Sequence, residues 1–423
     1  MSHSKWLSIP AVALGLLLAM PESAQALRPD HCPAYEEREV SAGALTEQTY
    51  RRLERIYEEI GDEEYAEAEE GLRALLDRRL DDYERATVYQ ALGHVAASRD
   101  RMDEAIRHFE RSVELNRMPN NVHFEMILQM SNLNYAEGNY REALDILDDF
   151  LCQAPEDKFN SNVFLLKAGA LSELDEFADA IVAINTAIDL DDDPREQWYA
   201  LRLGLEFELE RYRDATETLH ILIGMNPDSK QYWTQLSAIH LELDEDQRGM
   251  VVLKLAYRKG LLDRESEYRQ LASLLQAHNN PYRAAQVLSD AINDGYVERT
   301  QSHWEQVAGA WYEARELDNA LSAYGQAAEL SDDGRLYLQR AHILANQEDW
   351  EGVSESVNNA IDRGGLTQNQ EGNANVLLGT AEYNLDNLDR AERAFNAARN
   401  FSNVQETASQ WLNHIQNERG RRG

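Results

Sequence analysis

The sequence predicts an all-α protein, a solenoid of about ten helix hairpins followed by a C-terminal capping helix. The first observation is a small residue, usually alanine, that recurs at intervals of 33 to 38 residues along the 423-residue chain. A period near 34 residues is typical of repeats built from two paired helices. The second is that apolar residues within each repeat follow a helical spacing. The recurring small residues are Ala68, Ala105, Ala143, Ala180, Ala215, Gly249, Ala284, Ala320, Val353 and Ala391.

Each repeat contains two apolar stripes, one for each helix of its hairpin. The eighth repeat has Trp304, Val307, Ala308 and Trp311 on the first stripe and Ala320, Tyr324 and Ala327 on the second. Offsets of three, four and seven residues place side chains on one face of a helix. A small residue lets two helix backbones approach closely, and a larger residue one turn on fills the remaining space. The pattern therefore predicts tightly packed hairpins.

These stripes resemble the tetratricopeptide-repeat (TPR) pattern W-x2-L-G-x2-Y followed by A-x3-F-x2-A. The second repeat shows it as Tyr89, Leu92, Gly93 and Ala96, followed by Ala105, Phe109 and Ser112. The resemblance implies a right-handed TPR solenoid. Stacked hairpins of this kind form extended concave surfaces that hold other proteins, so it also implies binding rather than catalysis.

Glycine and proline mark the expected turns. Gly260, Gly295 and Gly364 each follow the last small residue of a repeat by four positions, where a left-handed C-cap is expected. Gly138 lies between the two helices of the third repeat. Pro155 comes after a second helix and prevents the helix from continuing.

The ends of the chain are expected to lie outside the array. Residues 1–26 read as a secretory signal peptide, with cleavage between Ala26 and Leu27, because an apolar run precedes an A-x-A motif. A membrane anchor is the alternative, but it needs about 20 apolar residues. We expect an extended N-terminal arm at 27–46, the TPR array at 47–403, and a capping helix with a basic tail at 404–423.

The composition restricts the partners. The formal net charge is −35, which repels nucleic acid and anionic lipid and favours proteins with basic patches. No motif for nucleotide, phosphate or nucleophilic chemistry occurs in the sequence. We therefore expect no enzyme activity, no catalytic residue and no cofactor.

The two cysteines, Cys32 and Cys152, leave two interpretations open. In an oxidising compartment an even number of cysteines favours a disulfide, whereas the alternative is two free thiols. His31 and Cys32 are neighbours, but two adjacent ligands do not make a metal site. We therefore expect no metal.

The partner-binding surface is expected on the concave face, on the stripe of each first helix that lies beside the buried one. Tyr312 is the strongest anchor candidate, because Trp311 already fills the packing position and interfaces favour exposed aromatic residues. The predicted concave residues are Gln90, His94, Gln231, Thr234, Arg269, Glu305, Tyr312, Arg335 and His342.

A closer resemblance covers about residues 194–412. It rests on Trp198-Tyr199, Tyr232-Trp233, the turn Ala256-Tyr257-Arg258-x-Gly260, and Pro281-Tyr282-x-Ala284-Ala285. These elements are similar to periplasmic TPR proteins of Gram-negative bacteria that are encoded alongside TonB–ExbB–ExbD systems. The resemblance implies a soluble periplasmic scaffold, accessory to energy transduction, with periplasmic segments of TonB, ExbB or ExbD as partners. Two alternatives stay open: an adaptor for cell-wall or outer-membrane assembly, and a regulatory subunit of an envelope enzyme.

Overall fold

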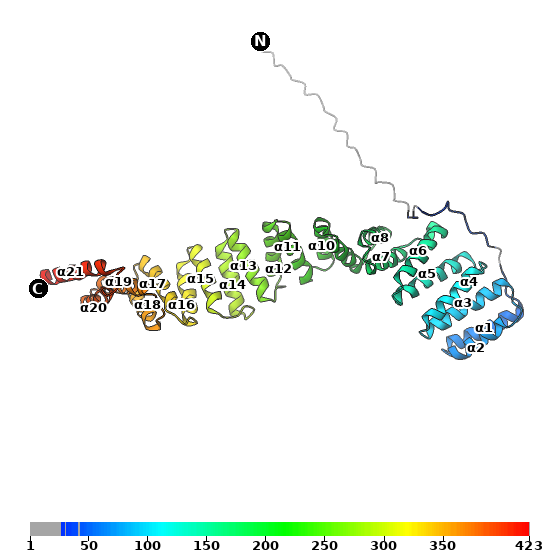
Figure 1. Ribbon diagram of the computed structural model, residues 1–423, viewed down its shortest axis with the longest axis horizontal. Helices are drawn as coiled ribbons and strands as arrows, with labels where there is room; N and C mark the ends of the chain where they lie inside the picture. Colours follow the sequence, from blue (N-terminus) through cyan, green and yellow to red (C-terminus); the bar gives the residue numbers. More distant parts are fainter. Residues whose placement is uncertain (1–26, 30, 41–42, 423) are drawn as a thin grey trace, which may run out of the picture. The chain divides into compact units, whose positions relative to one another are not determined.

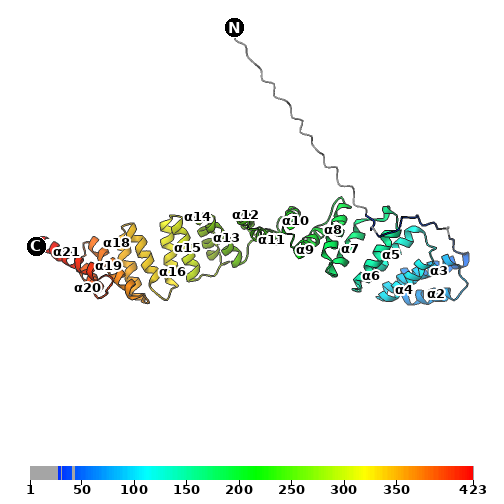
Figure 2. The same cartoon turned by 45° about the horizontal axis from the view of Figure 1, so that its top comes forward.

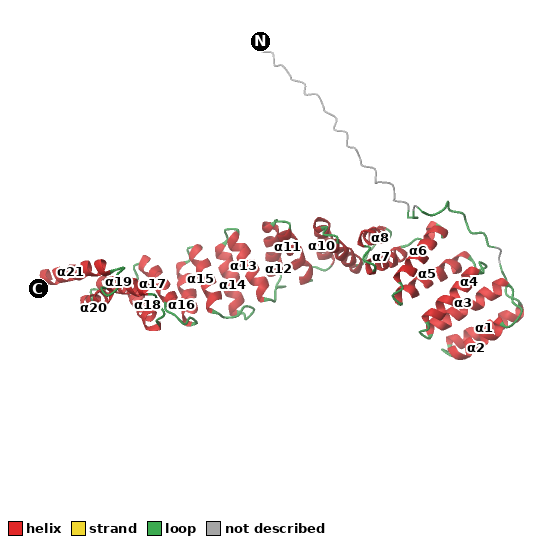
Figure 3. Ribbon diagram, viewed as in Figure 1, coloured by secondary structure: helices red, strands yellow, loops and turns green. Residues whose placement is uncertain are grey.

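The computed structural model describes residues 27–29, 31–40 and 43–422, and all regular structure within them is helical (Figure 3). The predicted signal peptide, residues 1–26, lies outside the described residues. The described chain forms two compact units, one up to Leu222 and one from Ile223 onward. None of the described helices combines the length and apolar character that crossing a bilayer requires.

Ten hairpins and one further helix follow one another along the described chain (Figure 1), as the sequence predicts. The helices are α1 Glu47–Gly61, α2 Tyr65–Leu76, α3 Asp82–Ser98, α4 Met102–Glu114, α5 Asn120–Ala136, α6 Tyr140–Gln153, α7 Ser161–Glu173, α8 Phe177–Asp189, α9 Glu196–Glu208, α10 Tyr212–Met225, α11 Lys230–Glu242, α12 Asp246–Arg258, α13 Glu265–Ala277, α14 Pro281–Asn293, α15 Gln301–Glu313, α16 Leu317–Glu329, α17 Arg335–Asn346, α18 Trp350–Arg363, α19 Gln368–Asn384, α20 Leu388–Ala398 and α21 Gln405–Arg422. A short 3-10 turn, Glu156–Lys158, connects α6 to α7.

The recurring small residues lie in the interior of the hairpins. All ten are buried, and Ala320 and Val353 have no exposed surface at all. Gly249 shows why a small residue is needed: a Cβ there would lie 3.0 Å from the Ser237 carbonyl oxygen of the paired helix. The periodicity in the sequence therefore reports positions where two helices meet closely.

Each hairpin turns through one residue in the left-handed region. It lies five positions before the recurring small residue in all ten hairpins, and only one of the ten is glycine, Gly138. The next backbone N–H donates to the carbonyl oxygen five residues earlier, as from Arg101 to Ala96 and from Glu316 to Trp311. This is the Schellman hydrogen bond that ends an α-helix. The predicted left-handed caps at Gly260 and Gly295 are confirmed by φ values of 73° and 83° and by hydrogen bonds from Leu261 to Ala256 and from Tyr296 to Ala291. The prediction is wrong for Gly364, because its φ of 74° is combined with a ψ of −161°, outside the left-handed helical region.

The N-terminal arm is extended and runs along the inter-hairpin loops of the N-terminal unit (Figure 2). Near its start, the Arg28 guanidinium donates to the carbonyl oxygens of Leu151, Cys152 and Ala154 at 2.6, 2.7 and 2.9 Å. These are terminal carbonyls of α6, which carry partial negative charge and favour a cation. The arm therefore caps a helix that begins more than a hundred residues later in the sequence.

Two further anchors hold the rest of the arm. Arg38 Nη1 donates to the Met118 carbonyl oxygen at 2.9 Å and to Asn120 Oδ1 at 2.6 Å, in the loop before α5 and at its first residue. Thr46, the N-cap of α1, donates its hydroxyl to Glu84 Oε1 of α3 at 2.7 Å. The arm thus contacts the end of the third hairpin, the loop before that hairpin, and the first helix of the second hairpin.

The C-terminal helix α21 caps the last hairpin. The Trp411 ring stacks on the buried Phe395 ring of α20, with centroids 5.2 Å apart. The helix extends to Arg422, so the expected basic tail is its last turn rather than a separate segment. Arg419 bonds to Asp389 and Glu392 of α20 at 2.5 and 3.1 Å. It therefore fixes the cap to its neighbour.

Candidate functional site

A hollow of about 330 Å³ opens on the first helices of the last three hairpins, in the C-terminal unit. Three odd-numbered helices, α15, α17 and α19, and the second helix α16 contribute to it. Its walls are mostly polar. The lining residues are Glu305, Tyr324, Arg335, Leu336, Leu338, Gln339, His342, Gln370 and Asn373.

Helix α17 contributes more lining residues to the hollow than any other helix, and the helical spacing of its polar residues explains why. Arg335, Gln339 and His342 follow one another at intervals of four and three residues, so they share one face of the helix. Ala341 and Leu344 are buried in the core on the opposite side. The packing of the hairpin therefore fixes which side chains of α17 reach the hollow.

Arg335 is held in place at the edge of the hollow by Asp333. Arg335 Nε donates to Asp333 Oδ2 at 3.0 Å, and the Arg335 backbone N–H donates to Asp333 Oδ1 at 3.0 Å. This pairing raises the pKa of Arg335 and lowers the pKa of Asp333. Arg335 is therefore a positioned cation at the edge of the hollow, with its other N–H groups available as donors.

Two further groups in the hollow stay uncharged at neutral pH. Burial raises the pKa of Tyr324, and the Glu305 carboxylate raises it further. Burial also lowers the pKa of His342, which favours its neutral form. Together with the amides of Gln339, Gln370 and Asn373, the hollow offers mainly uncharged donors and acceptors.

Three of the nine predicted concave residues meet in this hollow: Glu305, Arg335 and His342. Tyr312 lies on α15 with 46% of its surface exposed, outside the lining. Arg269 is exposed on α13 and pairs with Glu265 at 3.4 Å.

The other predicted residues lie elsewhere. Gln231 is exposed and Thr234 half-buried on α11. Gln90 and His94 are on α3 in the N-terminal unit, where His94 contacts the Phe109 ring edge-on at 5.2 Å. The part that these residues play in binding stays a prediction.

The sequence did not predict the other six lining residues, of which four are polar: Tyr324, Gln339, Gln370 and Asn373. The sequence pattern places Tyr324 on the packing stripe, and only 7% of its surface is exposed, but one side of it faces the hollow. Asn373 occupies the same register position in its repeat as Arg335 in the preceding one, 18 residues before the recurring small residue. This shared register position could have predicted that Asn373 lines the same surface as Arg335.

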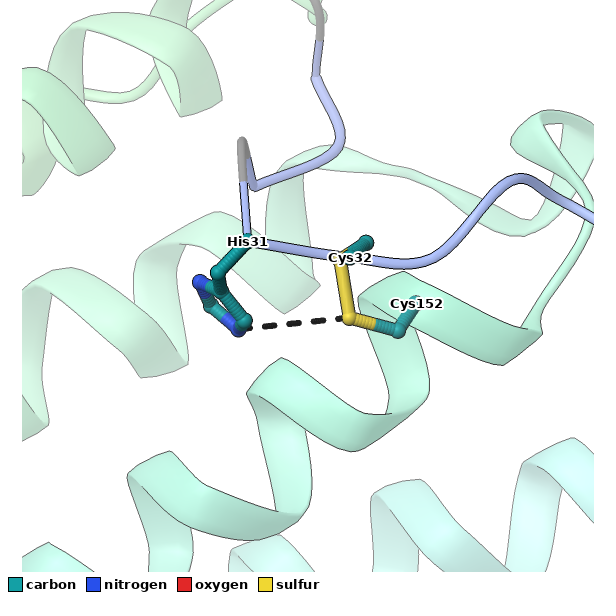
Figure 4. Close-up of side chains that lie close together, drawn as sticks. All are labelled: His31, Cys32 and Cys152. Carbon is teal, nitrogen blue, oxygen red and sulfur yellow. Dashed lines mark hydrogen bonds between the residues drawn. A yellow bond between two sulfur atoms is a disulfide. The ribbon is translucent and has the colours of Figure 1, made fainter.

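A second group of reactive side chains lies in the N-terminal unit. Cys32 of the arm and Cys152 of α6 form a disulfide, with Cα atoms 5.2 Å apart. His31 Nε2 lies 4.0 Å from Cys152 Sγ (Figure 4). The alternative of two free thiols is thus not what the structure contains.

Comparisons with known families agree with the geometry of the hairpins. Two tetratricopeptide-repeat family profiles match the chain, one over residues 86–117 and one over residues 134–203. These two stretches therefore match tetratricopeptide repeats, and the paired helix hairpins match a tetratricopeptide-repeat solenoid. Such repeats serve as protein-binding scaffolds. No curated protein matches the sequence.

Several solved structures are similar to this chain. They include a tetratricopeptide repeat protein from Parabacteroides merdae (13% identity, TM-score 0.38), which aligns with 63% of this chain over 99% of its own length. MamA has 19% identity and a TM-score of 0.34, covering 40% of this chain and 94% of its own. The C-terminal part of a TPR repeat-containing protein from Cytophaga hutchinsonii has 18% identity and a TM-score of 0.33, covering 58% and 98%. None of the three is close enough to transfer a ligand.

Proposed function

We propose that the protein is an exported, non-enzymatic scaffold that holds a segment of a partner protein in the hollow formed by α15, α16, α17 and α19. The observation that carries this proposal is the convergence of Arg335, Gln339 and His342 with the amides of α19 on one surface. Side-chain amides pair with both N–H and C=O groups of a peptide main chain. An open groove with such groups suits a segment in extended or helical form.

The charge of the protein favours a basic partner. With a net charge of −35, the chain attracts lysine-rich segments and repels acidic ones. Within the hollow, Glu305 is the carboxylate that such a segment would meet, since Asp333 is already paired with Arg335. The attraction acts over about 8 Å at physiological ionic strength. Binding should therefore weaken as salt is added.

For the identity of the partner, we propose a TonB-type energy-transduction complex in the periplasm. The support is the sequence resemblance of residues 194–412 to periplasmic TPR proteins encoded beside TonB systems, together with the charge. TonB-type periplasmic segments are in general rich in lysine and proline, which suits an acidic scaffold. The periplasmic location rests on the signal peptide proposed for residues 1–26.

The direct test measures binding of a lysine- and proline-rich periplasmic TonB segment to the purified protein by calorimetry, at low and moderate salt. A Glu305→Gln, Gln339→Ala double variant should lose roughly tenfold or more in affinity, because it removes one charge and one hydrogen-bonding amide from the hollow. Asn396→Ala is the matched control, since it removes an exposed amide on α20 that bonds only within its own helix. The control should bind like the wild type.

Other results would redirect the proposal. Equal affinity of the double variant and the wild type would show that the hollow is not the binding surface. Absence of TonB binding, with cell-wall or outer-membrane assembly proteins captured through the hollow, would favour the assembly-adaptor alternative. A change in the activity of an envelope enzyme on addition of the protein would favour the regulatory alternative.

A further inference from the structure

The arm brings three metal-binding side chains to one place. His31 Nε2, Cys32 Sγ and Cys152 Sγ all lie within 4.8 Å of one another (Figure 4). His31 is exposed to solvent, and both cysteines are half-buried, so an ion can reach them. The sequence shows only the adjacent pair His31 and Cys32. The third ligand, Cys152, comes from α6, 120 residues later.

We propose that reduction of the disulfide converts His31, Cys32 and Cys152 into a site for a thiophilic d10 cation, Zn²⁺ or Cu⁺. Two thiolates and one imidazole are ligands that these ions prefer over the oxygen ligands of an acidic surface. The disulfide and the metal exclude each other, because both use the same two sulfur atoms. The site is therefore present only in the reduced protein.

The spacing of the ligand atoms fits such an ion. Around a tetrahedral zinc, with Zn–S near 2.3 Å and Zn–N near 2.0 Å, a sulfur and a nitrogen lie about 3.5 Å apart and two sulfurs about 3.8 Å apart. His31 Nε2 already lies 4.0 Å from Cys152 Sγ. Once the S–S bond is broken, side-chain rotation is enough to separate the sulfurs. Three protein ligands leave the fourth zinc position for water, and Cu⁺ would be held by the three alone.

Reduction should leave the arm in place. Arg28, four residues before Cys32, bonds to three terminal carbonyls of α6 at 2.6 to 2.9 Å. Arg38, six residues after it, bonds to Met118 and Asn120. Neither set of hydrogen bonds involves the disulfide. The two anchors on either side therefore hold His31 and Cys32 next to Cys152 when the covalent bond is absent.

The chemistry balances with a dithiol reductant. The reductant gives two electrons and two protons to the Cys32–Cys152 disulfide, which becomes two thiols, while the dithiol itself becomes a disulfide. A divalent ion then binds the two sulfurs and releases their two protons. Reoxidation by a disulfide donor reverses the sequence and expels the ion. Metal binding is thus coupled to the redox state of the arm.

The test uses the purified protein in reduced and oxidised form, with Co²⁺ as a spectroscopic substitute for Zn²⁺. Reduced protein should bind one Co²⁺ and show thiolate-to-cobalt charge-transfer absorption, which carboxylates cannot produce. Zn²⁺ should displace it in direct competition, and a parallel titration with Cu⁺ against a chelator identifies the preferred ion. Oxidised protein should show no such absorption.

Variants measured in the reduced state identify the ligands. Cys32→Ser should abolish the charge-transfer band of a two-thiolate site, and His31→Ala should weaken binding by at least about tenfold. His278→Ala, which removes an exposed histidine after α13, is the matched control and should bind like the wild type. Circular dichroism should show equal helix content in all of them.

Three outcomes would overturn the proposal. They are a reduced wild type without thiolate-to-cobalt absorption, His31→Ala with wild-type affinity, and oxidised protein that binds the ion as tightly as the reduced form.

Discussion

Gly379 of α19 lies against the ring of Phe395 in α20, so closely that a Cβ at position 379 would be 2.7 Å from two ring carbons. Phe395 has no exposed surface. The equivalent pair in the second hairpin, Gly93 and Phe109, has the same relationship at 2.5 Å. In both hairpins the missing side chain of the glycine provides the space that the aromatic ring fills.

Gly379→Ala should therefore destabilise the protein, although alanine is the better helix former. Overpacking of a dense core costs about 1–3 kcal/mol, against a gain of roughly 1 kcal/mol in helix propensity. Gly309→Ala is the matched control, because no atom lies within 4 Å of its Cβ position, and it should stabilise by about 0.5–1 kcal/mol. Relative to the wild type, the urea midpoint of unfolding should fall for Gly379→Ala and rise for Gly309→Ala. A Gly379→Ala variant more stable than the wild type would contradict the packing described.

The hairpins could be predicted from the sequence because their steric requirement repeats. Close approach of two helices needs a small residue once per hairpin. Ala320 and its equivalents meet this need, and they recur at nearly constant spacing in the sequence. Of the turns five residues earlier, the one at Gly138 could be predicted from its glycine, but most could not. At four of the ten turns the left-handed residue is one that rarely adopts that conformation: Glu63, Glu210, Arg315 and Glu348. The energy of packing the two helices imposes the turn on whichever residue is there.

Arg315→Gly should stabilise the protein for this reason. Arg315 has a φ of 61°, a conformation that costs an ordinary L-residue about 1–2 kcal/mol and glycine little. Part of the gain is lost to the greater chain entropy of glycine in the unfolded state, so we expect about 0.5–1 kcal/mol. Gly138→Ala, at the equivalent turn with φ 79°, should destabilise by a similar amount. Denaturant midpoints measure both. Arg315→Gly less stable than the wild type would show that the arginine side chain contributes more than the strain costs.

The hollow could be predicted only in part. Helical register placed Glu305, Arg335 and His342 on the stripe beside the core, and these three line the hollow. Gln370 lies near the start of α19 and reaches the hollow through the stacking of that hairpin on the previous one, which no local pattern records. The path of the arm could not be predicted from the sequence either. The contacts of Arg28 and Arg38 join residues 80 to 126 positions apart.

The Glu69 carboxylate of α2 makes stability depend on pH. It accepts hydrogen bonds from Arg101 at 2.6 Å, Arg73 at 2.8 Å and Arg99 at 2.5 Å, and its side chain is 12% exposed. Arg101 and then Arg73 lower the pKa of Glu69 to about 2, from an ordinary value of 4.5. Because the folded state binds the proton more weakly than the unfolded state, the carboxylate stabilises the fold fully above about pH 5. This contribution is lost as the pH falls towards 2.

Glu69→Gln should therefore lower the free energy of unfolding by about 1–3 kcal/mol at pH 7, since it leaves three guanidinium groups without their shared partner. The difference from the wild type should shrink progressively between pH 5 and pH 2. Glu70→Gln, an exposed neighbour on the same helix, should stay within about 0.5 kcal/mol of the wild type at every pH. Urea titrations at pH 7, 5, 3 and 2 provide the measurement. If the loss in free energy of unfolding caused by Glu69→Gln were the same at all four pH values, ionisation of the Glu69 carboxylate would not be its cause.

Ala320→Leu tests the helix contact on which the periodicity depends. Ala320 has no exposed surface and belongs to the core that α15 and α16 share with Trp304 and Val307. A leucine there must separate the helices or displace their side chains, at about 1–3 kcal/mol. Ala238→Leu makes the same change at an exposed position of α11 and should alter stability by less than about 0.5 kcal/mol. If the two variants melted at the same temperature, the recurring small residues would reflect helix propensity rather than close approach of the helices.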